Sequence, residues 1–221
     1  MIDLLNSPAF TVFGSPASWA ELIGAVLGLA MVVCNIRQIH WGWPLAFFSS
    51  AMYCLVFSGS KLYGDAALQV FFAVMAVWGW VQWLRGTLPS GQALVVQTLS
   101  SNHQVTLVAV CLFLWAATGW FLATFTSTDV PYWDAFPTAV SVVATVLLGR
   151  KYIENWPAWV IVNAVSIALF AYKSLWLTVG LYSVFLVMAV VGWQAWRGVL
   201  RSSTQPCIKP NNSTANPNTA P

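Results

Sequence analysis

Two carboxamide side chains, Gln69 and Asn163, each interrupt a long apolar run. An unpaired amide in hydrocarbon costs several kcal/mol, so each must bind either another helix or a ligand. A carboxamide offers both a donor and an acceptor, which suits recognition of hydroxyl and amide groups. Both interpretations, a bond between helices and a ligand contact, stay open for these two residues at this point.

Aromatic side chains accompany the amides at helical spacing. Trp159 lies one turn before Asn163, and Trp80 lies three turns after Gln69, so each pair shares a helix face. Because an aromatic face attracts a flat cation, Trp80, Trp159 and Trp193 are candidate walls of a ligand site. Other tryptophans at the ends of apolar runs are expected in the aromatic belt at the membrane interface; these are Trp43, Trp83, Trp156 and Trp196.

Hydroxyl and acidic residues add weaker candidates. Asp134, Thr138, Ser141 and Thr145 follow one helical face. Serine and threonine in membrane helices often bond to a neighbouring turn or helix instead, for about 0.6 kcal/mol each. Carboxylates also stabilise helix N-termini, and we expect that role for Glu21. The further candidate substrate contacts are Ser50, Tyr53, Asp134, Ser166 and Tyr182.

Charge is scarce along the whole chain. Of 221 residues, 59% are hydrophobic and only 7% are charged, whereas soluble domains carry roughly 25% charged residues. This composition excludes an ordinary soluble enzyme, a nucleic-acid binder and a disordered chain. It indicates a polytopic membrane protein. No P-loop, hydrolase motif, metal-ligand cluster or transmembrane chain of carboxylates is present, so we expect no enzyme, no cofactor, no metal site and no ATP-driven or proton-driven pump.

Seven apolar runs are candidate membrane spans in an all-α protein. Basic residues concentrate in the connections on one side and in the C-terminal tail, which by the positive-inside rule predicts a cytoplasmic C-terminus and an external N-terminus. That side carries Arg37, Arg85, Arg150, Lys151, Arg197, Arg201 and Lys209, against Lys61 and Lys173 on the other. The spans cover residues 18–36, 44–58, 66–84, 104–125, 134–149, 157–172 and 175–196.

An internal repeat relates the two halves of the chain. A shift of 113 residues aligns two Trp-Pro pairs, Trp43-Pro44 with Trp156-Pro157, and two Gly-Trp-x-x-Trp segments at Gly79 and Gly192. Three-helix units joined by a fourth helix give a 3+1+3 arrangement of parallel repeats, which resembles SWEET transporters. The expected divisions are a first bundle (18–86), a linker with the fourth helix (87–130), a second bundle (131–198) and a disordered cytoplasmic tail (199–221).

Several segments resemble the Pnu family of bacterial vitamin transporters, and most closely its PnuC branch. The resemblance is carried by Gln69-Val70-Phe71-Phe72 in the first half, and by Arg150-Lys151-Tyr152-x-Glu154-Asn155-Trp156 and Trp159-x-x-x-Asn163 in the second. It covers about residues 21 to 196. It implies ATP-independent uptake of nicotinamide riboside across the bacterial inner membrane, made productive by a cytosolic riboside kinase, with the amides and tryptophans at the riboside site.

The chemistry of these residues leaves other substrates open. Nicotinamide riboside joins a flat pyridinium cation to a carboxamide and a ribose, which suits aromatic and amide side chains. Thiamine is also a flat cation, and riboflavin belongs to a related branch. A SWEET-like sugar facilitator and a membrane enzyme or sensor without transport are the further alternatives. The expected partners are the substrate and the bilayer, with a homo-oligomer possible and no nucleic acid.

Overall fold

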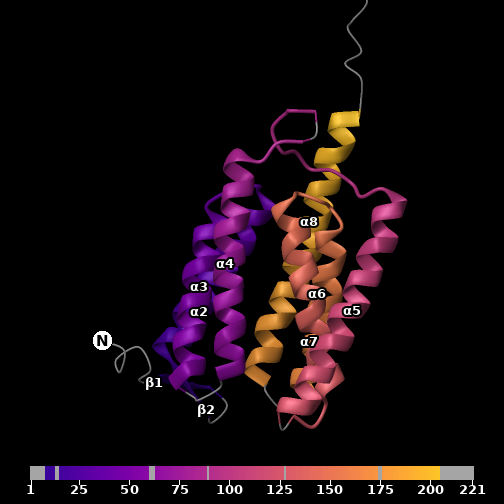
Figure 1. Cartoon of the computed structure of the whole chain (residues 1–221). Helices are drawn as coiled ribbons and strands as arrows, with labels where there is room; N and C mark the ends of the chain where they lie inside the picture. The colour runs from indigo at the N-terminus through magenta and orange to yellow at the C-terminus, as the bar shows by residue number, and fades with distance from the viewer. Residues whose placement is uncertain are drawn as a thin grey trace, which may run out of the picture.

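The computed structural model describes residues 8–12, 15–59, 63–88, 90–126, 128–173 and 176–204, and helices carry most of these residues (Figure 1). Within the described ranges, five helices are long and apolar enough to span a membrane, namely α2, α5, α6, α7 and α8, and the apolar part of α3 is shorter. The helices are α2 (Trp19–Ile36), α3 (Gly42–Gly59), α4 (Tyr63–Arg85), α5 (Ser101–Phe125), α6 (Pro131–Gly149), α7 (Asn155–Tyr172) and α8 (Trp176–Thr204).

Helices α2, α3 and α4 form a first bundle, in which α3 packs against both neighbours. A capping box begins α2: the Ser18 hydroxyl accepts from the Glu21 N–H and the Glu21 carboxylate accepts from the Ser18 N–H. The expected capping role of Glu21 is therefore confirmed. The turn after α2 places Gln38 at a φ of 56°, in the left-handed region that often ends helices.

Helices α6, α7 and α8 form a second bundle with corresponding local geometry. Proline at the first position suits the start of α6, because no helical partner is needed for its nitrogen. The turn after α6 places Lys151 at a φ of 56°, and Lys151 aligns with Gln38 under the 113-residue shift. The Ile39 N–H donates to the Cys34 carbonyl, and the aligned Tyr152 N–H donates to the Leu147 carbonyl.

The bundles meet through α2 against α8 and α4 against α6, while α5 packs along α6 at the edge of the molecule (Figure 1). We call the end of the molecule that carries Arg37, Arg85 and Arg150 the basic end. The connection between α4 and α5 crosses the basic end, at the top of Figure 1. It is bound there because the Gln97 N–H donates to the Lys151 carbonyl and Gln97 accepts from Ile153.

Two features depart from the expected fold. A short antiparallel hairpin, β1 (Pro8–Val12) with β2 (Ser15–Ser18), precedes α2, whereas the sequence predicted only helices. Helix α8 continues to Thr204, so residues 199–204 are helical instead of belonging to a disordered tail. The rest of the expected tail, 205–221, lies outside the described residues. The helices α2 to α8 otherwise match the seven expected spans closely.

Candidate substrate site

A cavity of about 260 Å³ lies between the two bundles, toward the basic end. It is lined by the C-terminal halves of α2 and α6 and by the N-terminal halves of α3 and α7, because these helix pairs turn at the basic end. The middle of α4 and the N-terminal half of α8 complete the walls. The polar and aromatic lining residues are Asn35, Trp43, Ser49, Ser50, Phe72, Ser141, Thr145, Trp156, Trp159, Asn163, Tyr182 and Phe185.

Asn163 and Trp159 both line this cavity from α7. The Asn163 amide nitrogen donates to the Trp159 carbonyl at 2.8 Å, so half of the amide is used within the helix. Its carbonyl oxygen accepts no hydrogen bond from the described residues. Since the side chain is otherwise buried, with 5% of its surface exposed, this oxygen is available to a donor inside the cavity. The indole of Trp159 lies one turn away along the same wall.

Ser50 and Tyr182 contribute from the opposite bundles. Ser50 is buried on α3, and its hydroxyl makes no hydrogen bond with the described residues. The Tyr182 ring on α8 packs against Phe170 at 5.0 Å and Phe185 at 6.0 Å between ring centroids. The structure therefore brings four of the expected site residues to one cavity, and they are Ser50, Trp159, Asn163 and Tyr182.

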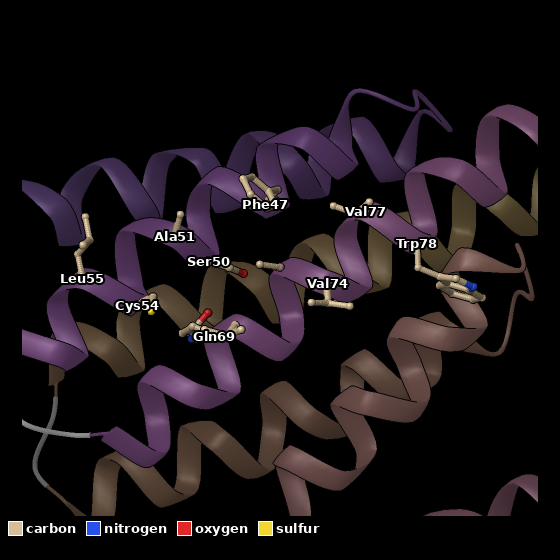
Figure 2. Close-up of a pocket in the computed structure, with 11 residues that line it drawn as sticks. Phe47, Ser50, Ala51, Cys54, Leu55, Gln69, Val74, Val77 and Trp78 are labelled. Carbon is tan, nitrogen blue, oxygen red and sulfur yellow. The ribbon is translucent and has the colours of Figure 1, made fainter.

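Gln69 lies in an adjoining groove between α3 and α4, and not in the cavity lining. In Figure 2, Gln69 and Ser50 point toward the space between these helices, among apolar side chains that include Cys54, Val74 and Trp78. Gln69 makes no hydrogen bond with the described residues. Ser50 lines both spaces, so it marks the point where the groove and the cavity adjoin.

Five other expected contacts lie outside the cavity lining. Asp134 accepts from Thr128 and forms an ion pair with Lys173 at 2.7 Å, which ties α6 to the far end of α7. The Trp80 indole donates to His40 Nδ1 at 3.3 Å. Trp193 lies under the Arg197 guanidinium at 5.7 Å from the ring centroid. Tyr53 packs over Gly24, and Ser166 is buried on α7.

Asn35 was missed by the sequence analysis although it lines the cavity. It lies one turn beyond Val32 on the small-residue face of α2, and its amide nitrogen donates to Met31 Sδ at 3.0 Å. Its side-chain oxygen is buried and has no partner within the described part of the chain. An amide near the end of an apolar run was the signal that could have identified it.

The expected belt of interfacial tryptophans is wrong for Trp43, Trp156 and Trp196. They have 3%, 2% and 0% of their surface exposed, so packing between helices has replaced contact with lipid headgroups. Trp43 and Trp156 line the cavity, and neither indole N–H has a partner within the described residues. Each ring fits against a glycine, Gly79 for Trp43 and Gly192 for Trp156.

Residues 18–198 match the model of the nicotinamide mononucleotide transporter family. The chain belongs to this family. Family membership and the apolar helices together make it a multi-pass membrane transporter and not an enzyme. The fold agrees with a solved structure described as the vitamin B3 transporter PnuC, with a TM-score of 0.68, 22% identity and 83% coverage of each chain.

Curated members of the family cover most of this chain. The nicotinamide riboside transporter PnuC of Escherichia coli is 26% identical over 208 residues, covering 83% of this chain and 87% of the relative. The riboflavin/roseoflavin transporter RibM of Streptomyces davaonensis is also 26% identical, over 213 residues, covering 94% and 98%. The nicotinamide riboside transporter PnuC of Neisseria mucosa is 24% identical over 217 residues, covering 91% and 80%.

Proposed function

We propose that the protein takes up nicotinamide riboside by facilitated diffusion. The observation that carries this proposal is that Trp159 and Asn163 line one cavity between the bundles. The buried amide of Asn163 donates through its nitrogen, whereas its oxygen accepts no hydrogen bond from the described residues. An indole face attracts the pyridinium cation, and the free amide oxygen accepts from a carboxamide or ribose hydroxyl. Relatives described as nicotinamide riboside transporters support the same substrate.

Transport itself is proposed to proceed by alternation of two parallel three-helix repeats. Two correspondences support a 3+1+3 repeat. Gln38 and Lys151 have the same backbone φ, and Trp43 and Trp156 each pack against a glycine of the last helix in their own bundle. A site at the interface of two repeats becomes accessible from either side when they rock against each other. The divisions are again 18–86, 87–130 and 131–198, with α5 in the linker.

The direction of net uptake follows from events outside this chain. The basic end faces the cytoplasm in this proposal, because Lys and Arg are enriched in cytoplasmic connections. No ATP-binding motif is present in the sequence, so the substrate moves down its gradient. A cytosolic kinase that phosphorylates the riboside removes it from the equilibrium and keeps the gradient inward, without contact between the two proteins.

Riboflavin is the second candidate substrate, since RibM is as similar in identity as the riboside transporters and is covered almost completely. The cavity favours the riboside. At about 260 Å³ it is slightly smaller than usual ligand cavities, which span roughly 300–1,000 Å³. A single six-membered ring with a ribose fits such a space better than the three fused rings of riboflavin with a ribityl chain.

Calorimetry on the purified protein tests the substrate. Nicotinamide riboside is expected to bind, and riboflavin and thiamine are expected to give weaker heats or none. Binding of riboflavin without the riboside would move the protein to the other branch of the family. Exchange of labelled riboside in proteoliposomes without ATP tests the mechanism, and binding without exchange would contradict facilitated diffusion.

A further inference from the structure

Hydrogen bonds from two indoles join the bundles reciprocally at the basic end. The Trp83 indole of α4 donates to the Leu148 carbonyl of α6 at 3.1 Å. The Trp196 indole of α8 donates to the carbonyls of Asn35 and Ile36 of α2, each at 3.2 Å. Under the 113-residue shift Trp83 aligns with Trp196, and Asn35 aligns with Leu148. Each bundle therefore binds the C-terminal carbonyls of the other bundle's first helix in the same way.

Four tryptophans form a continuous layer at this end of the cavity. Trp83 contacts Trp196 across the bundles, with 6.4 Å between ring centroids. Trp43 packs edge-on against Trp83 at 5.7 Å, and Trp156 packs edge-on against Trp196 at 5.6 Å. We call Trp43, Trp83, Trp156 and Trp196 the tryptophan layer. Because Trp43 and Trp156 also line the cavity, the layer lies between the cavity and the basic end.

The hydrogen bonding of the layer is unequal in the observed state. Trp83 and Trp196 are satisfied only by acceptors on the opposite bundle. The buried N–H groups of Trp43 and Trp156 have no partner among the described residues, and neither does the buried side-chain oxygen of Asn35. Unpaired buried groups are unfavourable and would gain water if the layer opened. The cross-bundle bonds therefore favour closure, whereas the unpaired groups favour opening.

We infer that the tryptophan layer is the gate of the cavity at the basic end and that the reciprocal hydrogen bonds of Trp83 and Trp196 hold it closed. Separation of the bundles at this end breaks these bonds together and exposes Trp43 and Trp156 to water. The inference rests on the proposed alternation of the bundles. If the two indoles had only a structural role, they would hold the bundles together in every state. Their loss would then change access to the cavity equally from both sides of the membrane.

The test measures access to the cavity from each side of the membrane. A reporter cysteine replaces Ala46, which lines the cavity, in a chain whose Cys34, Cys54, Cys111 and Cys207 are changed to alanine. A membrane-impermeant thiol reagent is applied to vesicles of either orientation. Trp83→Phe and Trp196→Phe each remove one N–H while keeping an aromatic ring. Trp115→Phe is the matched control. The Trp115 indole donates to the Tyr132 carbonyl at 2.8 Å, and this bond does not join the two bundles.

We expect Trp83→Phe and Trp196→Phe each to raise the rate of labelling from the basic-end side about tenfold. This change corresponds to a loss of about 1.4 kcal/mol in the free energy that favours the closed gate. Because the two positions are aligned, both variants should have similar effects. The rate of labelling from the opposite side should stay unchanged or fall. Labelling unchanged in both variants, or equally raised by Trp115→Phe, would overturn the gate. Faster labelling from both sides would also overturn it, since that result indicates a loosened structure.

Folding and substrate identity are kept separate from this readout. Size-exclusion profiles and melting temperatures of each variant identify molecules that have lost their structure. If Trp83→Phe is unstable, the aligned Trp196→Phe variant carries the same prediction. Labelling needs no substrate, so failure of nicotinamide riboside to bind would contradict the proposed function and leave the gate result intact. Normal binding with unchanged labelling would contradict the gate alone.

Discussion

The two ends of the Asn163 amide have different surroundings, which bears on its proposed contact with a ligand. Its nitrogen is committed to the Trp159 carbonyl, whereas its oxygen accepts nothing from the described residues. A substrate donor that meets this oxygen replaces water without breaking any bond of the protein. The expected bond between helices is not observed, because the nitrogen bonds within α7, and the contact with a ligand stays a proposal for the oxygen.

Asn163→Ala is expected to weaken binding of nicotinamide riboside while the protein stays folded. Loss of a partner that leaves a ligand donor unpaired costs about 1–3 kcal/mol, or roughly 5- to 150-fold in Kd. Calorimetry measures the change. Ser166→Ala is the control, because Ser166 is buried on the same helix but does not line the cavity. Equal effects of the two substitutions would place the site elsewhere.

Asp134→Asn tests the opposite expectation. The carboxylate is engaged by Lys173 and Thr128 away from the cavity, so the substitution should leave the Kd unchanged. Partly exposed ion pairs contribute about 0.2–1 kcal/mol, and the free energy of unfolding should fall by no more than this. Binding measurements and thermal denaturation check the two statements. A large loss of affinity would return Asp134 to the substrate site.

At the scale of the helices, glycine sets the distance between neighbours in each bundle. Gly79 on α4 accommodates the Trp43 ring of α3, and Gly192 on α8 accommodates the Trp156 ring of α7. A methyl group at either glycine would overlap the ring. Both tryptophans are consequently held in place where they line the cavity, without any hydrogen bond to their indole nitrogens.

Gly79→Ala and Gly192→Ala are each expected to destabilise the protein by about 1–3 kcal/mol, the usual cost of overpacking. Thermal denaturation in detergent provides the measurement. Gly180→Ala is the matched control, because no atom lies within 4 Å of the added carbon, and alanine favours a helix by roughly 0.5–1 kcal/mol. Unequal effects at Gly79 and Gly192 would argue against equivalent packing in the two bundles.

Most of the helices could be predicted from the sequence, since backbone groups in lipid must pair within a helix and long apolar runs reveal this need. The start of α2 was also predictable, because Ser18 and Glu21 have capping-box spacing. The β1–β2 hairpin and the last turns of α8 were missed. Both segments lie where apolar periodicity ends. Pairing of the two strands and extension of α8 depend there on contacts that the hydropathy pattern does not report.

At the scale of the whole molecule, the cavity depends on two bundles that meet mainly through α2 with α8 and α4 with α6. Gly28 on α2 lies at both kinds of contact. A carbon added there would be 3.6 Å from Phe185 of the second bundle and 3.6 Å from Ser49 of its own bundle. One position therefore allows the movement of the bundles to be compared with movement inside a bundle.

A cysteine pair at Gly28 and Phe185, joined by a short cleavable linker, is expected to stop transport, because it fixes one bundle against the other. The pair at Gly28 and Ser49 should leave more flux, because it joins helices that move together. Labelled riboside uptake in proteoliposomes is the readout, and cleavage of the linker should restore it. Undiminished flux with the first pair cross-linked would contradict the rocking mechanism.

The tryptophans mark the limit of prediction from this sequence. Trp43 and Trp156 beside proline at the ends of apolar runs are typical of the interfacial belt. Their burial depends on glycines on other helices and on contacts between bundles distant in sequence. Likewise, Trp80 shares a helical face with Gln69, but sequence periodicity cannot tell which neighbour that face meets. The nature of the site was predictable in part, but its exact walls were not.

Helix α5 is expected to make the protein sensitive to bilayer thickness. Its apolar part, residues 105–125, extends about 32 Å, and only 6% of the most apolar window of α5 is buried inside the protein, so most of this surface is open to lipid. A hydrocarbon core of about 30 Å matches this apolar length, so a thinner bilayer would make α5 tilt. Because α5 packs mainly along α6, its tilt would act first on the second bundle. Lipid chain length should therefore shift the balance between the two orientations of the site.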